Sequence, residues 1–142
     1  MKKSKLLVET TFDFDLLGLI APLKDYKLAW LINRSLGINL KKAKDYHMEF
    51  LNQPDLIISQ FMLEKEHGFI QLLKNKSYPV GGHSRYLIPE LQGMDYFLLC
   101  QDFTNEVDLN TYIGDLSKAK GIHSIVKINT IKLKSKENLL TY

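Results

Sequence analysis

The sequence predicts an α+β fold, a mainly antiparallel sheet of about six strands with two helices packed on one face. Several segments have the period-two or near-continuous apolar pattern of strands, and two have the three- and four-residue apolar spacing of amphipathic helices. The order strand, helix, strand occurs near both ends of the chain, with a hairpin pattern between them. This order favours an α+β fold, in which the helices pack against one sheet.

The first strand is predicted over residues 11–20, where Phe12, Phe14 and Leu16 alternate with polar residues. A helix should follow, because Pro22 suits a first helical position and Gly37 suits the residue after the last turn. We expect its apolar stripe to face the sheet. The stripe comprises Leu28, Leu31, Ile32 and Leu36, widened by Tyr26 and Trp30.

The middle of the chain predicts strands. From Leu40 the pattern has period two, with Tyr46, Met48 and Phe50 on one side and Asp45, His47 and Glu49 on the other. Apolar runs at 56–63 and 69–73 predict a hairpin, and the polar, glycine-containing segment 74–86 predicts a long loop. The run 94–100 is apolar almost throughout, which indicates a central strand covered on both faces.

The last third predicts a second helix, a strand and an end that we leave open. Asn105 or Thr104 can cap the helix, and Asp108 lies near its start, where a negative charge complements the helix dipole. The expected apolar stripe is Leu109, Tyr112, Ile113 and Leu116. Residues 122–128 read as a strand, whereas 130–142 fit both helical and irregular structure.

Length and composition indicate one cytoplasmic domain over residues 1–142, with flexible ends near 1–8 and 134–142. Cys100 is the only cysteine, which excludes an intrachain disulfide and fits a reducing compartment. No apolar stretch is long enough to span a bilayer, and Glu9 interrupts any signal-like core. All but two of the 19 basic residues are lysines, which lack the planar fork of arginine for bidentate base contacts.

The run of residues 87–96 reads Leu-Ile-Pro-Glu-Leu-Gln-Gly-Met-Asp-Tyr. It resembles the signature of the IPExxxVDY family of small Bacteroidota proteins. The matching positions are Ile88, Pro89, Glu90, Asp95 and Tyr96, and Met94 stands where the signature has valine. The resemblance continues through 17–19, 24–30 and 134–139. It implies a bacterial, cytoplasmic setting, and it implies no activity, ligand or site.

The motif and the loop before it form one candidate site, because a glycine-containing loop that ends at a central strand often carries functional groups. The candidate residues are His83, Arg85, Pro89, Glu90, Asp95 and Tyr96. A structural role is favoured over chemistry. In that interpretation Pro89 and Gly93 shape the chain, Glu90 caps a turn, and Asp95 and Tyr96 satisfy local backbone donors.

The lysine-rich segment 116–136 is a second candidate, for nucleic acid or another acidic surface, because it contains no acidic residue. Its lysines are Lys118, Lys120, Lys127, Lys132, Lys134 and Lys136. No interleaved aromatic residue suits base stacking, so a solvated face is the commoner explanation.

No cofactor or metal site is expected. The histidines at 47, 67, 83 and 123 lack the spacing of familiar zinc motifs, and Gly81 and Gly82 lack the lysine and hydroxyl residue of a P-loop. Cys100 lies in an apolar run, where a thiol usually behaves as a small buried hydrophobe.

The leading functional hypothesis is a noncatalytic domain that binds another protein in the cytoplasm. The alternatives are a nucleic-acid-associated factor that uses segment 116–136 and an enzyme with its site around 83–96.

Overall fold

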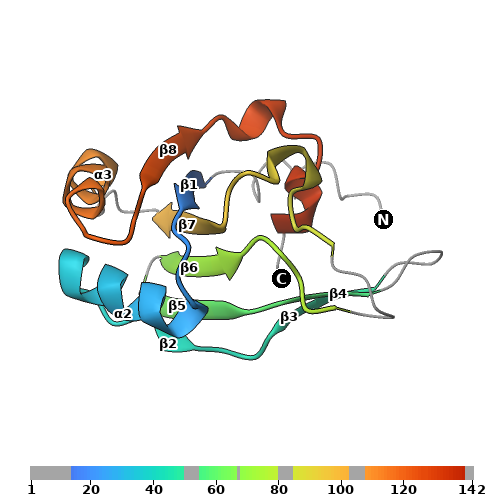
Figure 1. Cartoon of the computed structure of the whole chain (residues 1–142), viewed down its shortest axis with the longest axis horizontal. Helices are drawn as coiled ribbons and strands as arrows, with labels where there is room; N and C mark the ends of the chain where they lie inside the picture. Colours follow the sequence, from blue (N-terminus) through green and yellow to red (C-terminus); the bar gives the residue numbers. More distant parts are fainter. Residues whose placement is uncertain (1–13, 50–54, 67, 80–84, 103–107, 140–142) are drawn as a thin grey trace.

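A six-stranded antiparallel sheet forms the centre of the molecule in the computed structural model (Figure 1), which describes residues 14–49, 55–66, 68–79, 85–102 and 108–139. Its strands lie in the order β2-β5-β6-β7-β1-β8. Their bounds are β1 Asp15–Ile20, β2 Lys41–Lys42, β5 Gln60–Lys65, β6 Gly68–Lys74, β7 Tyr96–Asp102 and β8 Ser124–Ile128. A separate two-stranded sheet pairs β3 (Tyr46–Met48) with β4 (Leu56–Ile58).

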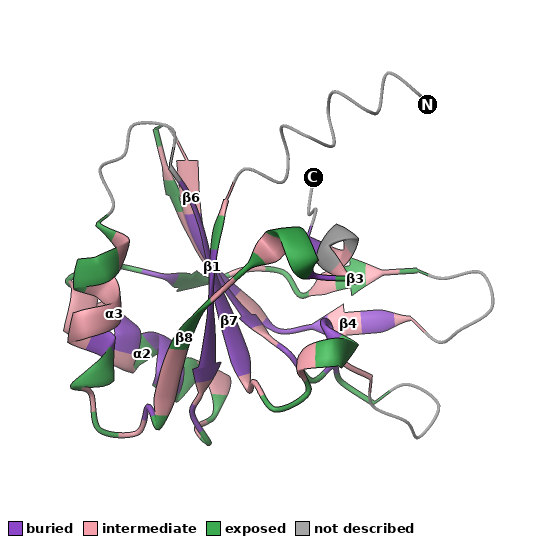
Figure 2. Cartoon of the chain, turned by 90° about the horizontal axis from the view of Figure 1, so that it is seen from above, coloured by how far each residue is buried: buried purple, intermediate pink, exposed green. Residues whose placement is uncertain are grey.

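The two faces of the large sheet are covered differently, as the view along the sheet shows (Figure 2). Helices α2 (Asp25–Leu36) and α3 (Leu109–Ser117) lie on one face. The β3–β4 hairpin and the short 3-10 helices η1 (Pro89–Leu91), η2 (Thr130–Lys132) and η3 (Lys136–Leu139) lie on the other. The predicted α+β fold, with a six-stranded antiparallel sheet and two helices, is confirmed.

Strand β7 lies between β6 and β1, and its alternate side chains enter two cores. Leu98 and Cys100 pack in the cluster beneath the helices, whereas Phe97 and Leu99 pack in the cluster on the opposite face. All four are 3% exposed or less. This confirms the prediction of a central strand covered on both faces, because successive side chains of a strand point to opposite sides.

Helix α2 starts three residues after Pro22, so the prediction that Pro22 is its first residue was wrong. Lys24 is extended, and Leu28 donates the first helical hydrogen bond to its carbonyl. The chain before it is held in a non-helical path, because the hydroxyl of Tyr96 donates to the carbonyl of Leu23. At the other end, Gly37 has a left-handed φ of 68°, which confirms it as the helix-ending glycine.

Two aromatic residues of α2 face solvent, which contradicts their predicted place on the buried stripe. Tyr26 is 56% exposed and Trp30 is 60% exposed. The buried residues of the helix are Leu28, Ala29 and Ile32. Positions 26 and 30 lie one turn apart on the side of the helix opposite these residues.

The predicted hairpin over 56–63 and 69–73 is confirmed only for β5 and β6. The apolar run breaks at Ser59, where β4 ends and the chain changes from the small sheet to the large one. The Ser59 hydroxyl donates to the carboxylate of Asp25, and its carbonyl accepts from the backbone N–H of Lys74. The second contact continues the β5–β6 register by one residue, so Ser59 lies at the junction between the small sheet and the large one.

Asp108 precedes helix α3, and its carboxylate accepts hydrogen bonds from the backbone N–H groups of Asn110 and Thr111. Asp108 is therefore the cap, while the proposed caps Thr104 and Asn105 lie outside the described residues. The predicted apolar stripe of α3 does pack on the core. The segment left open after β8 forms η2 and η3, and Leu139 is buried in the second cluster.

Candidate functional site

The segment 87–91 is built into the core on the face of the sheet away from the helices. Leu87 and Ile88 are fully buried, and Pro89 opens the 3-10 helix η1. Asn75, which is also fully buried, holds this turn. Its Nδ2 donates to the carbonyls of Leu91 and Met94 at 2.9 and 3.0 Å, and its Oδ1 accepts from the N–H of Ile88 at 2.9 Å.

Glu90 ties this turn to the C-terminal segment. Its two carboxylate oxygens accept hydrogen bonds from the backbone N–H and the hydroxyl of Ser135 at 2.7 and 2.8 Å. Two further contacts support the same junction, since Asn138 donates to the carbonyl of Leu87 and the hydroxyl of Tyr46 donates to the carbonyl of Asn138, both at 2.7 Å. Burial raises the pKa of Tyr46 to about 12.

Glu90 is stabilised in its charged form. Partial burial raises its pKa, but the hydrogen bonds from Ser135 outweigh that effect and hold the pKa of Glu90 below its usual value. A carboxylate with both oxygens engaged in this way acts as an anchor for the chain.

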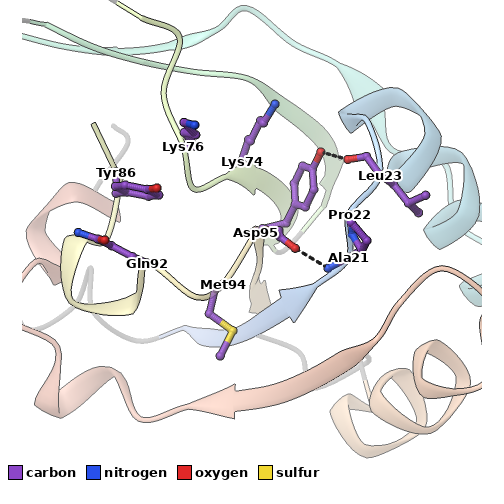
Figure 3. A pocket seen from close by; sticks show the side chains of 10 residues that line it. Ala21, Pro22, Leu23, Lys74, Lys76, Tyr86, Gln92, Met94 and Asp95 are labelled. Carbon is purple, nitrogen blue, oxygen red and sulfur yellow. Dashed lines mark hydrogen bonds between the residues drawn. The ribbon is translucent and has the colours of Figure 1, made fainter. Parts of the chain in front are cut away.

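Asp95 and Tyr96 hold the segment between β1 and α2 (Figure 3). Asp95 Oδ2 accepts from the N–H of Ala21 at 2.8 Å, and the hydroxyl of Tyr96 donates to the carbonyl of Leu23 at 2.5 Å. Burial and the nearby carboxylates of Asp25 and Asp95 raise the pKa of Tyr96. The expectation that these residues satisfy local backbone donors was wrong, because their partners lie more than 70 residues away and one of them is an acceptor.

The described members of the first candidate site therefore do not converge on one point. Glu90 turns to Ser135, whereas Asp95 and Tyr96 turn to the start of α2. Arg85 pairs its backbone with Ser77. His83 lies outside the described residues.

A pocket of about 290 Å³ lies beside the motif, between the end of β6 and the segment before α2 (Figure 3). Asp95 and Tyr96 form part of its wall, together with Ala21, Pro22, Leu23 and Met94. Its remaining lining residues are Lys74, Lys76, Tyr86 and Gln92. Sequence analysis placed these four in a loop or a turn, and no sequence signal brings residues 74–76 to residues 86–92.

The lysines of segment 116–136 follow one edge of the molecule. Lys118 and Lys120 lie after α3, Lys127 is on the edge strand β8, and Lys132 and Lys134 lie beyond it. All five are exposed, and Lys127 Nζ is 3.9 Å from the carboxylate of Asp15. Nothing is described of the Lys136 side chain. Two of the five lysines precede β8, one lies on it and two follow it.

The outer side of α2 carries a row of side chains that sequence analysis assigned to the core or did not single out. Tyr26, Trp30 and Arg34 follow one another at four-residue spacing, so they line one side of the helix. The guanidinium of Arg34 lies 5.4 Å from the centre of the Trp30 ring, within the range of a cation–π contact. We call these three residues the α2 row.

His47, Glu49 and Asp55 bring one ligand atom each to within 4.8 Å of the others beside the β3–β4 hairpin. His47 Nε2 lies 2.9 Å from Asp55 Oδ2. All three are in contact with solvent, and an exposed hydrogen bond between His47 and Asp55 accounts for the contact of these two residues. Sequence spacing among the histidines could not reveal this group, because it combines one histidine with two carboxylates.

Cys100 is 3% exposed within the core beneath the helices, as expected for a small buried hydrophobe. Among the described residues, no helix has both the length and the apolar character needed to cross a membrane.

Comparison with protein-family models, curated proteins and solved structures gave no match to this chain.

Proposed function

We propose that this chain is a noncatalytic, cytoplasmic protein-binding domain and that the α2 row is its main contact surface. The observation that carries the proposal is the exposure of Trp30, the only tryptophan of the chain, at 60% on a helix whose opposite side is buried. Large exposed aromatic side chains grouped on one surface are typical of interaction sites. A lone buried cysteine, Cys100, supports the cytoplasmic setting.

The composition of the α2 row supports a protein partner. Tryptophan, tyrosine and arginine are the three residue types most enriched among side chains that dominate binding energy at protein interfaces. Tyr26 and Trp30 offer large, rigid contact areas, and Arg34 adds donors beside the indole ring. The row therefore has the chemistry of an interface centre.

The inner side of α2 fixes the row in place. Leu28 and Ile32 are fully buried and Ala29 is 3% exposed, all in the cluster that packs on the sheet. A helix anchored in this way presents its outer side chains with little loss of backbone freedom on binding. This rigid support makes the row suitable for recognition.

The charged residues around the α2 row indicate which kind of surface the partner should have. Lys27 and Arg34 are both exposed on the outer side of α2, while the acidic Asp25 is engaged by the Ser59 hydroxyl. The row is therefore aromatic with positive charge around it. A partner surface with an apolar pocket and acidic rim would complement it.

The test is affinity purification of the tagged full chain from its native host at low salt, with and without nuclease. Wild type is compared with Trp30→Ala and with Ile131→Ala, a matched loss of an exposed apolar side chain that is 82% exposed and far along the chain in η2. We expect a partner that survives nuclease, is retained by Ile131→Ala, and is reduced by about tenfold or more by Trp30→Ala. Equal capture by both variants would contradict the proposal.

The second candidate function is nucleic-acid association through the exposed lysines at 118, 120, 127, 132 and 134. Its specific support is the absence of any acidic residue from segment 116–136. If this function is the correct one, captured partners disappear with nuclease, and RNA retention falls steeply with added salt. Failure to retain RNA at low salt would exclude it.

A further inference from the structure

The pocket beside the motif is separate from the α2 row and has two lysines on one rim. Residue 74 ends β6, the chain bends at Asn75, and Lys76 forms an isolated bridge with Tyr86. Lys74 and Lys76 both line the pocket, while Asn75 between them is fully buried.

The polar groups of this rim make no hydrogen bond or ion pair with the residues that the structure describes. Within the described part of the chain, neither ammonium group of Lys74 or Lys76 has a hydrogen bond or an ion pair. The same holds there for the hydroxyl of Tyr86 and the side-chain amide of Gln92. The pocket is therefore bordered by four polar side chains, two of them cationic, which are available to a ligand.

The opposite wall is built differently. Asp95 Oδ2 accepts a hydrogen bond from the N–H of Ala21, and the other carboxylate oxygen accepts no hydrogen bond from the described residues. Pro22 supplies apolar surface beside it, whereas the side chain of Met94 is turned towards Gly18 and Ile128 (Figure 3). The pocket therefore combines a cationic rim, an aromatic side chain, apolar walls and one acceptor.

We propose that this pocket binds a small organic phosphate. The phosphate group lies between Lys74 and Lys76, whose two positive charges match a phosphate dianion. The organic part packs against Tyr86 and Pro22, and a hydroxyl of the ligand donates to Asp95. A volume of about 290 Å³ is at the lower end for ligand pockets, so the ligand is of the size of a phosphorylated sugar or a phenyl phosphate.

The hydrogen bonds of Asp95 and Tyr96 give the pocket a fixed wall. Asp95 binds the backbone N–H of Ala21, and Tyr96 binds the backbone carbonyl of Leu23. Ala21 and Leu23 both line the pocket. The wall is therefore formed before any ligand binds, and preorganisation of this kind favours affinity.

The probe for the first test is phenyl phosphate, titrated into the isotope-labelled full chain and followed by amide chemical shifts. We expect saturable binding with the largest shifts at the residues that line the pocket. The variant Lys74→Gln/Lys76→Gln should weaken binding at least tenfold. The control Lys132→Gln/Lys134→Gln removes the same charge from exposed positions outside the pocket, and it should bind within twofold of wild type.

A second variant blocks the pocket and keeps its charges. Gln92 is exposed at the rim, so Gln92→Trp should fill the hollow, retain the fold and abolish the saturable shifts. Its counterpart is Tyr78→Trp, in a neighbouring hollow of about 270 Å³ that shares Lys74 and Lys76. Tyr78→Trp should bind like wild type.

Four results would overturn the inference. The first is the absence of saturable binding to wild type, and the second is an equal loss in the two double-lysine variants, which would indicate general charge attraction. The third is binding of phenyl phosphate to Gln92→Trp with the affinity of wild type. This result tests the inference even if Lys74→Gln/Lys76→Gln fails to fold. Phenyl sulfonate is titrated in parallel, and equal affinity for this monoanion would contradict the requirement for a phosphate dianion.

Discussion

Replacing Asn75 by alanine should cost more stability than any other single loss of a polar side chain near the motif. Asn75 is fully buried, and its side chain makes three hydrogen bonds to the turn that follows Ile88. The substitution leaves the N–H of Ile88 buried without an acceptor and deprives the carbonyls of Leu91 and Met94 of a donor. The backbone bonds of residue 75 to Leu87 and Asp95 stay in place.

The expected magnitude follows from these three contacts. An unsatisfied buried N–H costs about 1–3 kcal/mol, and with two weakened carbonyl contacts we expect a total loss of about 2–4 kcal/mol. For an m-value of roughly 2 kcal/mol/M in urea, the unfolding midpoint should fall by about 1–2 M. Small domains are stable by only about 5–15 kcal/mol, so the variant should fold with a reduced margin.

The assay is urea unfolding followed by far-ultraviolet circular dichroism. Asn110→Ala is the matched control, because Asn110 is exposed on α3 and its side chain has no described structural partner. That variant should change the free energy of unfolding by less than about 0.5 kcal/mol. A loss in Asn75→Ala no larger than in the control would refute the role assigned to Asn75.

Three further predictions concern the motif and the core. Tyr96→Phe removes the hydrogen bond to the carbonyl of Leu23 and should lower the free energy of unfolding by about 1 kcal/mol, measured by urea unfolding. Glu90→Gln should lower the melting temperature at pH 7. The difference in melting temperature between this variant and wild type should shrink as the pH is lowered. The reason is that hydrogen bonds from Ser135 hold the folded-state pKa of Glu90 below its unfolded value, so its contribution is present above the unfolded pKa and is lost as pH falls through the folded pKa. Cys100 is buried and should react with an aromatic disulfide reagent only in denaturant, as measured by absorbance of the released thiolate.

Each of these predictions has a clear contrary result. A Tyr96→Phe variant as stable as wild type would mean that the hydroxyl bond contributes nothing. A gap in melting temperature between Glu90→Gln and wild type that stays constant from pH 7 to acid would show that the charge of Glu90 is not the stabilising feature. Rapid reaction of Cys100 in the native protein would contradict its burial.

The fold could be predicted from the sequence where one local pattern determines the structure. The near-continuous apolar run 94–100 predicts a strand covered on both faces, and residues 96–100 of this run lie in the central strand β7. Gly37 marks the end of α2 because a left-handed residue is needed there. These features depend on residues within a few positions of one another.

Prediction failed where the outcome depended on distant partners. The width of an apolar helix stripe does not show which aromatic residues are buried, so Tyr26 and Trp30 were assigned to the core although the sheet covers only the side with Leu28 and Ile32. The strand break at Ser59 depends on Asp25, 34 residues earlier. A single serine in an apolar run gives no signal of such a contact.

The motif was predicted as structural in general terms, but its partners could not be identified. Asp95 and Tyr96 hold residues more than 70 positions away, and Glu90 holds a residue 45 positions later. Asn75 was not singled out at all, because asparagine is common in loops and its sequence neighbours do not indicate burial. The resemblance to the IPExxxVDY family stays a prediction, and the structure supplies a physical role for each of its described polar side chains.

The central claim is that the α2 row contacts a protein partner, and site-specific photocrosslinking in the native host tests it most directly. A benzophenone amino acid is placed at position 30 in one strain and at position 131, a highly exposed apolar position outside the α2 row, in a second strain. The account predicts a discrete, nuclease-resistant crosslinked protein from position 30 and none from position 131. Crosslinks that are absent at position 30, identical at both positions, or removed by nuclease would contradict it.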